Sequence, residues 1–152
     1  MYSDLREWLE QVEHLGELKK ITGAHWDAEM GPLTQLMHEQ YKDRTPALLF
    51  DEIPDYPKGY RTLYGHFSTL NRIALTLGLP LNKGRVELVA AYREKLRNLE
   101  LIPPQFVEDG PVLENVQMED HVNLLEFPVP RHHELDRARY IATACAVITK
   151  DP

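Results

Sequence analysis

Cysteine is nearly absent from this sequence, in which Cys145 is the only one. A single cysteine excludes an intramolecular disulfide and a cysteine-based zinc site. The residues on either side of it, Ala144 and Ala146, are apolar, and this setting predicts a buried thiol with no reactive role.

Long apolar runs and basic runs are missing as well. No apolar run approaches the ~18 residues of a membrane span, and the N-terminus is charged from Asp4 onward. We therefore expect a soluble protein in the reducing cytoplasm, with no membrane partner. No basic run is longer than Lys19-Lys20, and 17 Lys and Arg against 24 Asp and Glu give a formal charge of -7. Nucleic acid is not an expected partner.

The motifs of common catalytic sites are also missing. Glycines are too scattered for a phosphate-binding loop, and there is no G-x-S-x-G, H-E-x-x-H or C-x-x-C pattern. No serine stands near a histidine at the spacing of a catalytic triad. We therefore assign no catalytic residue and no metal ligand to this chain.

Helical and strand-like patterns alternate along the first hundred residues. Ser3 is a candidate N-cap, and apolar residues follow it at helical spacing until Gly16, at Leu5, Trp8, Leu9 and Val12. Strands are expected at residues 17–22, 47–50 and 61–64, and we expect them to share one sheet.

Three further helices complete this half of the chain. Pro32 is expected at the first position of one of them. Ser68 is the expected N-cap of the next, which would end at Gly78, and the last is expected over residues 86–96.

The pattern changes after Pro103-Pro104, and a domain boundary is expected near residues 100–110. Beyond it, β-prone runs occur at residues 112–116, 122–127 and 140–149. The predicted class is α/β, of the α+β kind, with a mixed N-terminal domain over residues 1–105 and a second, β-rich domain that begins at residue 106.

The run over residues 140–149 is the most apolar strand-like stretch of the chain, and a turn signal, Lys150-Asp151-Pro152, follows it directly. An apolar strand needs neighbours on both edges, because an exposed apolar edge invites aggregation. We therefore expect this sequence to be the front of a longer one.

One polar cluster lies before this last run and combines histidines, arginines and carboxylates, at Arg131, His132, His133, Glu134, Asp136, Arg137 and Arg139. Adjacent histidines on an extended chain point to opposite faces, so a metal would need His133 with Glu134 or Asp136 in a bent loop. The favoured interpretation is a polar connection whose charges pair with one another.

A second cluster consists of His25, Trp26, Asp27 and Glu29, whose types could serve as acid, base or ligand. The favoured interpretation is a loop that anchors Trp26 in the core. Asp27 or Glu29 would then lie near the positive start of the following helix.

Several short motifs also follow one another in a specific order. They include Asp4-Leu5-Arg6-Glu7-Trp8-Leu9, Ala24-His25-Trp26-Asp27-Ala28-Glu29, Pro46-Ala47-Leu48-Leu49-Phe50-Asp51, Phe127-Pro128-Val129-Pro130-Arg131 and Arg139-Tyr140-Ile141 with Thr143. In this order, and over essentially the whole chain, they resemble the N-terminal portion of the UbiD-like family of aromatic acid decarboxylases.

The resemblance implies reversible decarboxylation of aromatic or unsaturated acids with prenylated FMN, a divalent metal that is usually manganese, and often potassium. In that family the modified flavin is the electron sink when carbon dioxide leaves. It also implies a split β-barrel that holds the flavin, whose first strands would begin at residue 106, and a homo-oligomeric full-length protein. The family's metal ligands and catalytic acids come after the position of Pro152, so this chain alone is expected to be inactive.

Thr143 is the one cofactor contact that the resemblance carries to this sequence, and plain strand packing is its alternative role. Many relatives have Asp-Gly-Gly before the Arg or Lys, where this chain has Asp136-Arg137-Ala138-Arg139, so a turn with positive φ would be strained and a different loop shape is expected. The alternative function is a non-catalytic subunit of this family that binds a partner through its open barrel edge.

Overall fold

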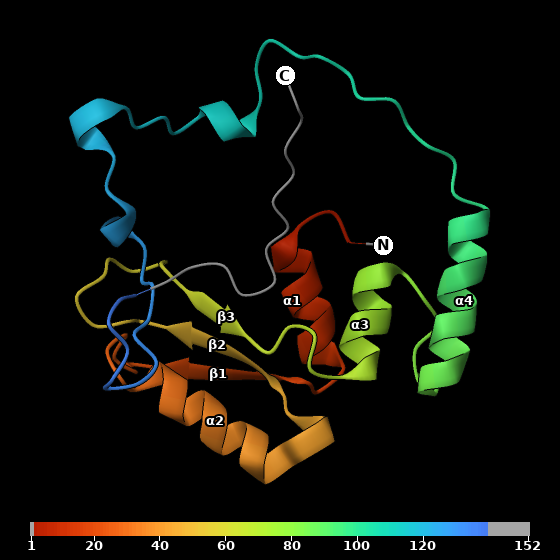
Figure 1. Ribbon diagram of the computed structural model, residues 1–152, viewed down its shortest axis with the longest axis horizontal. Coiled ribbons are helices and arrows are strands. Elements are labelled where there is room, and N and C mark those ends of the chain that lie inside the picture. Colours follow the sequence, from red (N-terminus) through yellow and green to blue (C-terminus); the bar gives the residue numbers. More distant parts are fainter. Residues whose placement is uncertain (1, 140–152) are drawn as a thin grey trace.

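A small sheet organises the part of the chain that the structure describes, residues 2–139. The computed structural model contains β1 (Leu18–Thr22), β2 (Ala47–Asp51) and β3 (Thr62–Tyr64), in the spatial order β1-β2-β3. β1 and β2 are parallel, and β3 is antiparallel to β2. The three predicted strands and their common sheet are confirmed, and with the helices they make an α+β fold (Figure 1).

The central strand separates two hydrophobic clusters, one on each face of the sheet. Leu48 and Phe50 belong to the cluster that includes residues of α2 (Met30–Tyr41). Ala47 and Leu49 belong to the cluster that includes residues of α1 (Leu5–His14). This alternation follows from the two-residue period of a strand. α2 is the crossover that a parallel pair of strands requires, and Figure 1 shows it on the face opposite α1.

The predicted helices exist, but their first residues differ from the prediction. α1 is capped by Asp4, whose carboxylate accepts from the N–H groups of Arg6 and Glu7, so Ser3 is not the cap. α3 (Leu70–Leu77) is capped by Thr69 in place of Ser68. Both wrong predictions arise because two adjacent residues can cap and the backbone conformation selects one.

α2 also begins earlier than predicted. It starts at Met30, so Pro32 occupies the third helical position and not the first. The first four N–H groups of a helix have no intrahelical partner, so a proline in this turn removes no hydrogen bond.

A buried arginine joins α3 to the sheet. The side chain of Arg72 has no exposed surface, and its Nη1 donates to the Glu17 carboxylate at 2.9 Å. Its Nη2 donates to the Thr45 carbonyl at 2.6 Å and its Nε to the Gly65 carbonyl at 3.1 Å. Burial lowers the pKa of Arg72, and Glu17 opposes this shift. Each nitrogen of the guanidinium therefore has an acceptor, as a buried cation requires.

α4 (Arg85–Arg97) is the last α-helix of the described residues, close to its predicted position. The arm, residues 98–127, then runs outside the sheet and helices and returns to the sheet at its far end (Figure 1). None of the helices within residues 2–139 is both long and apolar enough to cross a bilayer.

The strands expected within the arm are wrong. The arm instead contains three short 3-10 helices, η2 (Pro111–Leu113), η3 (Glu119–His121) and η4 (Leu124–Glu126). A β-prone run becomes a strand only when a neighbouring strand accepts its hydrogen bonds, and none of the described strands pairs with the arm. The run at 140–149, its thiol and Thr143 lie outside the described residues, and the boundary near residue 105 stays a prediction.

Candidate functional site

The two polar clusters of the sequence meet in space. Nε of Arg131 donates to Oδ1 of Asp27 at 2.5 Å. The backbones also pair, because the N–H of Arg131 donates to the Trp26 carbonyl at 3.0 Å and the N–H of Ala28 donates to the Arg131 carbonyl at 2.9 Å. The chain that returns from the arm is therefore fastened to the loop before α2, 104 residues earlier.

A second arginine strengthens this attachment. The guanidinium carbon of Arg139 lies 4.2 Å from the ring centroid of Trp26, within the range of a cation–π contact. Its Nε donates to the Val129 carbonyl at 2.6 Å, and its Nη2 donates to the Phe127 carbonyl at 3.1 Å and to the Tyr56 hydroxyl. We call the set Trp26, Asp27, Tyr56, Arg131 and Arg139 the junction.

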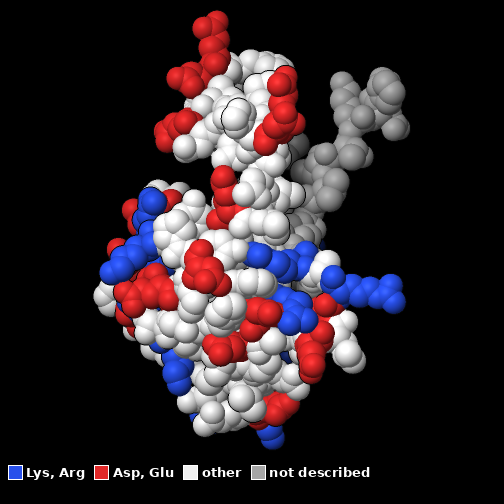
Figure 2. Space-filling model, turned by 90° about the vertical axis from the view of Figure 1, so that its left-hand side faces the viewer, with Lys and Arg blue, Asp and Glu red and all other residues white. Residues whose placement is uncertain are grey.

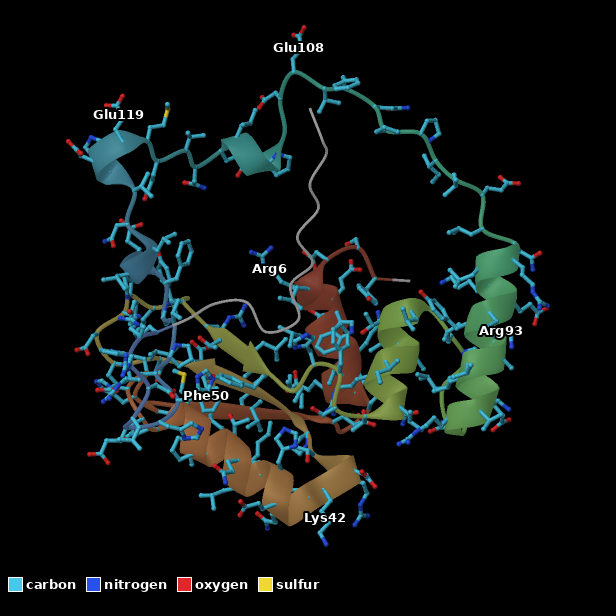
Figure 3. The ribbon with its side chains drawn as sticks, in the orientation of Figure 1. Arg6, Lys42, Phe50, Arg93, Glu108 and Glu119 are labelled. Carbon is cyan, nitrogen blue, oxygen red and sulfur yellow. The ribbon has the colours of Figure 1, made fainter. Side chains whose placement is uncertain are left out.

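His132 connects the junction to the hydrophobic core. Its Nε2 lies 2.9 Å from the Tyr64 hydroxyl, and the two rings meet edge to face at 5.6 Å. Tyr64 in turn packs edge to face on Phe50 of β2, which is labelled in Figure 3. Burial lowers the pKa of His132, so a neutral imidazole is favoured here.

Gly31 allows the returning chain to lie against the first turn of α2. A Cβ atom at this position would be only 2.6 Å from the backbone oxygen of His132. Such a distance is far below van der Waals contact, so only glycine permits this approach.

The charges of the junction stabilise each other. The hydrogen bond from Arg131 lowers the pKa of Asp27, and the same bond raises the pKa of Arg131. About a third of each side chain is exposed, at 34% for Asp27 and 30% for Arg131, so solvent screens the pair. Both groups are charged at neutral pH.

The structure confirms the interpretation of the 25–29 cluster, with Glu29 as the carboxylate at the helix start, and corrects that of the 131–139 cluster. Asp27 pairs with Arg131 and does not serve the start of α2, whereas Glu29 lies at that start and its carboxylate accepts the N–H of His25 at 2.7 Å. Trp26 does pack against the core cluster, as predicted. The prediction that the charges of the 131–139 cluster pair with one another is wrong, because Arg131 pairs with a carboxylate of the other cluster. Among the described residues no ion pair joins two side chains of the 131–139 cluster, whose Asp136 carboxylate accepts a backbone N–H.

The loop after Arg131 is bent, as the metal alternative required, because the N–H of His133 donates to the Asp136 carboxylate at 3.0 Å. Within residues 2–139, however, no group of three or more His, Cys, Asp and Glu side chains is placed to hold a metal ion. The junction is therefore a structural fastening and offers no metal centre.

A cavity of about 940 Å³ lies elsewhere, between α3 and α4. The carboxylate of Glu17, one of the lining residues, already accepts from the Thr69 hydroxyl at 2.5 Å, the Asn71 amide at 3.1 Å and Arg72. This polar group is therefore used for structure and is not available to a ligand.

Two family models match the chain in succession. Residues 9–92 match the 3-octaprenyl-4-hydroxybenzoate carboxy-lyase N-terminal domain, and residues 105–152 match the Rift-related domain of the same enzymes. This chain belongs to the UbiD family. Trp26, Asp27 and Tyr56 of the junction lie in the first matched segment, whereas Arg131 and Arg139 lie in the second. The junction therefore connects the two matched segments.

Curated relatives of the UbiD family include decarboxylases of two kinds of acid. The chain is 35% identical over 148 residues to the pyrrole-2-carboxylic acid decarboxylase of Pseudomonas aeruginosa, covering 92% of this chain and 29% of that protein. It is 31% identical to a phenolic acid decarboxylase of a Streptomyces species, covering 99% of this chain and 31% of that protein. The chain thus spans about a third of the length of these relatives.

Solved structures of UbiD-class enzymes share the fold. The closed form of the vanillic acid decarboxylase of Sedimentibacter hydroxybenzoicus matches with a TM-score of 0.78 at 27% identity, covering 93% of this chain and 29% of that chain. The enzyme HmfF of Pelotomaculum thermopropionicum, in complex with FMN, matches with a TM-score of 0.64 at 27% identity, covering 90% of this chain and 28% of that chain. The α+β fold is therefore that of UbiD-class enzymes.

Proposed function

We propose that this chain is the N-terminal part of a UbiD-family decarboxylase that reversibly removes or adds carbon dioxide on an aromatic or unsaturated acid. The observation that carries the proposal is the succession of the two family models, over residues 9–92 and 105–152, in one chain. The identity of 35% to a pyrrole-2-carboxylic acid decarboxylase supports a carboxylic acid substrate.

The proposed cofactor is prenylated FMN, together with manganese and possibly potassium, in a cytoplasmic homo-oligomer. The FMN complex of the related HmfF supports a flavin. When bound, the prenylated flavin supplies an electron sink for the departing carbon dioxide. The described residues do not by themselves fit a metal site, so we place the metal ligands outside residues 2–139. Thr143 is the proposed flavin contact of this chain.

The described residues have a supporting role in this proposal. The sheet and helices form a base with two hydrophobic clusters, and the junction fastens the returning chain to that base. The proposed division of the chain is into one domain over residues 1–105 and a second over residues 106–152. The second domain would begin the split β-barrel that holds the flavin. The base contains no proposed catalytic group. Its proposed role is therefore to position the second domain and not to take part in proton transfer.

The test is to express the complete reading frame with a supply of prenylated FMN, beside the 152-residue chain. Visible absorbance, bound manganese and release of carbon dioxide from pyrrole-2-carboxylate, vanillate and other phenolic acids are recorded for both. The proposal expects flavin, metal and turnover in the complete protein only. A complete protein that binds no flavin and releases no carbon dioxide from any of these acids would overturn it.

One observation favours a second candidate, a non-catalytic interaction subunit. The arm has no Lys or Arg and contains seven carboxylates, so the other 17 acidic and 17 basic residues of the chain balance. Figure 2 shows acidic side chains on this protruding part and mixed charges below it, and in Figure 3 Glu108 and Glu119 point away from the molecule. Large apolar side chains of the arm, such as Phe106 and Leu101, are exposed too.

A surface of this kind suits a partner with basic and apolar groups. The solution mass of the 152-residue chain, alone and with the other proteins encoded beside it, separates the two functions. A stable complex without flavin would favour the interaction subunit over the enzyme.

A further inference from the structure

Two apolar stripes line the cavity of about 940 Å³ between α3 and α4, which lie side by side in Figure 1. The stripe of α3 consists of Leu70, Ile73 and Leu77, and that of α4 consists of Leu88, Val89 and Tyr92. Side chains three and four residues apart lie on the same side of a helix. Each helix therefore presents an apolar surface to the cavity.

Much of this apolar surface is not covered by the described chain. Leu88 is the only buried residue of α4, and Val89 and Tyr92 are 56% and 38% exposed. On the facing helix, Ile73 and Leu77 belong to neither hydrophobic cluster of the sheet. A ligand with an apolar body would remove this surface from water, which is favourable in proportion to the area that it covers.

The charged groups of the cavity favour an anion. The Glu17 carboxylate is already used, whereas two arginines of the lining are not: Arg44, the last residue of η1 (Lys42–Arg44), and Arg85, the first residue of α4. Within residues 2–139 neither guanidinium forms an ion pair or a side-chain hydrogen bond. Asp43 is the one other charged residue of the lining, so two unpaired cations are set against one carboxylate.

A monocarboxylate with an apolar body matches both features of the cavity. A guanidinium can donate two parallel hydrogen bonds to a carboxylate, and the apolar body can lie between the stripes. An inorganic anion would leave the stripes uncovered, and an uncharged apolar molecule would leave the arginines unused. The volume lies within the range of about 300–1,000 Å³ that is usual for small-molecule sites.

We propose that the cavity between α3 and α4 binds a monocarboxylic acid, whose carboxylate is held by Arg44 and Arg85 and whose apolar body lies between the two stripes. The inference goes beyond the proposed function, because binding here requires neither flavin nor metal. Aromatic acids and fatty acids share this chemistry, so the test has to separate these two sources of ligand.

The test uses the complete protein and the photoreactive acid 4-benzoylbenzoate. Irradiation attaches this probe to neighbouring residues, and mass spectrometry of the digested protein locates it. Labelling of residues 67–92 is expected to saturate below about 1 mM and to be reduced by competing acids. Stronger competition by 1-naphthoate identifies an aromatic ligand, and stronger competition by octanoate identifies a fatty acid. Octanol, which lacks the carboxylate, is expected to compete about 10-fold less well than octanoate.

Variants of the lining separate the roles of the arginines and of the apolar wall. Arg44→Gln and Arg85→Gln are each expected to weaken labelling about 5-fold, because each removes a charge-assisted contact with the carboxylate. Val89→Glu is expected to weaken it about 10-fold, since it places a like charge in the apolar wall. The matched controls are Arg93→Gln and Val86→Glu, on α4 but outside the lining, with Arg93 labelled in Figure 3, and both should stay within about 2-fold.

All five substituted side chains are exposed, so the variants are expected to fold, and thermal unfolding of each one checks this. A rise in Tm with octanoate or 1-naphthoate that is smaller in R85Q than in R93Q is the second expected result. Equal labelling of R44Q, R85Q and R93Q, or octanol as effective as octanoate, would overturn the inference. Residues 67–92 that stay unlabelled, because a second copy or another part of the complete protein fills the cavity, would overturn it as well.

Discussion

Replacement of Arg72 by methionine tests the buried ion pair that joins α3 to the sheet. Methionine is similar in length and apolar, so the change removes the charge and the donors while most of the volume remains. The Glu17 carboxylate, 20% exposed, and the carbonyls of Thr45 and Gly65 would lose a donor. Removal of one partner of a buried ion pair costs about 3–5 kcal/mol.

The effect is large compared with the stability of a domain, which is typically about 5–15 kcal/mol. Since each kcal/mol shifts the Tm of a chain of this size by roughly 2–4 °C, we expect a fall of about 6–20 °C. The partial exposure of Glu17 favours the lower end, because water can solvate part of the unpaired carboxylate.

Thermal unfolding followed by circular dichroism measures this fall. Arg6→Met is the matched control, because Arg6 is 83% exposed and its pair with Asp4 is long, at 3.7 Å, so a change below about 0.5 kcal/mol is expected. The combined replacement of Glu17 by glutamine and Arg72 by methionine should cost less than the sum of the single changes. A Tm of the Arg72 variant within about 2 °C of the control would refute the reasoning, since it would mean that the pair contributes little.

Three other changes test the core and the junction. Phe50→Ala should destabilise the chain by about 3–5 kcal/mol in urea unfolding, because this side chain is fully buried on β2; a cost below about 1 kcal/mol would contradict the assigned core. Gly31→Ala should release the returning chain and increase protease cleavage near His132, since the new methyl would collide with its backbone; an unchanged cleavage pattern would contradict this close approach. The lowered pKa of Asp27 means that its pair with Arg131 stabilises the fold above the unfolded pKa of 3.8 and is lost as pH falls through the lower folded value. Asp27→Asn should therefore reduce the loss of stability between neutral pH and pH values below 3.8, and a pH profile identical to that of the unsubstituted chain would exclude the pair as a contributor.

Local patterns in the sequence determined most of the secondary structure of the first hundred residues. The helical spacing of Trp8, Leu9 and Val12 places them together on the buried side of α1, and the continuous apolar run of β2 indicates the central strand. These signals are local, because a helix or a strand reveals its buried face by its own period. The cap residues were missed by one position, since Asp4 and Thr69 each have a neighbour of equal capping ability.

The arm shows the limit of such patterns. Its valines and leucines favour strands, yet the structure forms 3-10 turns there. Strand formation depends on a neighbouring strand that composition does not reveal, so β propensity alone could not decide the outcome.

The junction and the buried Arg72 were decided by the tertiary structure alone. Asp27 and Arg131 lie 104 residues apart, and nothing in either cluster indicates the other as its partner. Arg72 lies in the first turn of α3 like an ordinary surface residue. Only the tertiary structure surrounds it with acceptors, from Glu17 before β1, Thr45 before β2 and Gly65 after β3. The sequence determines a local element through the period of its own residues, whereas a long-range pair depends on the path of the whole chain between its two members.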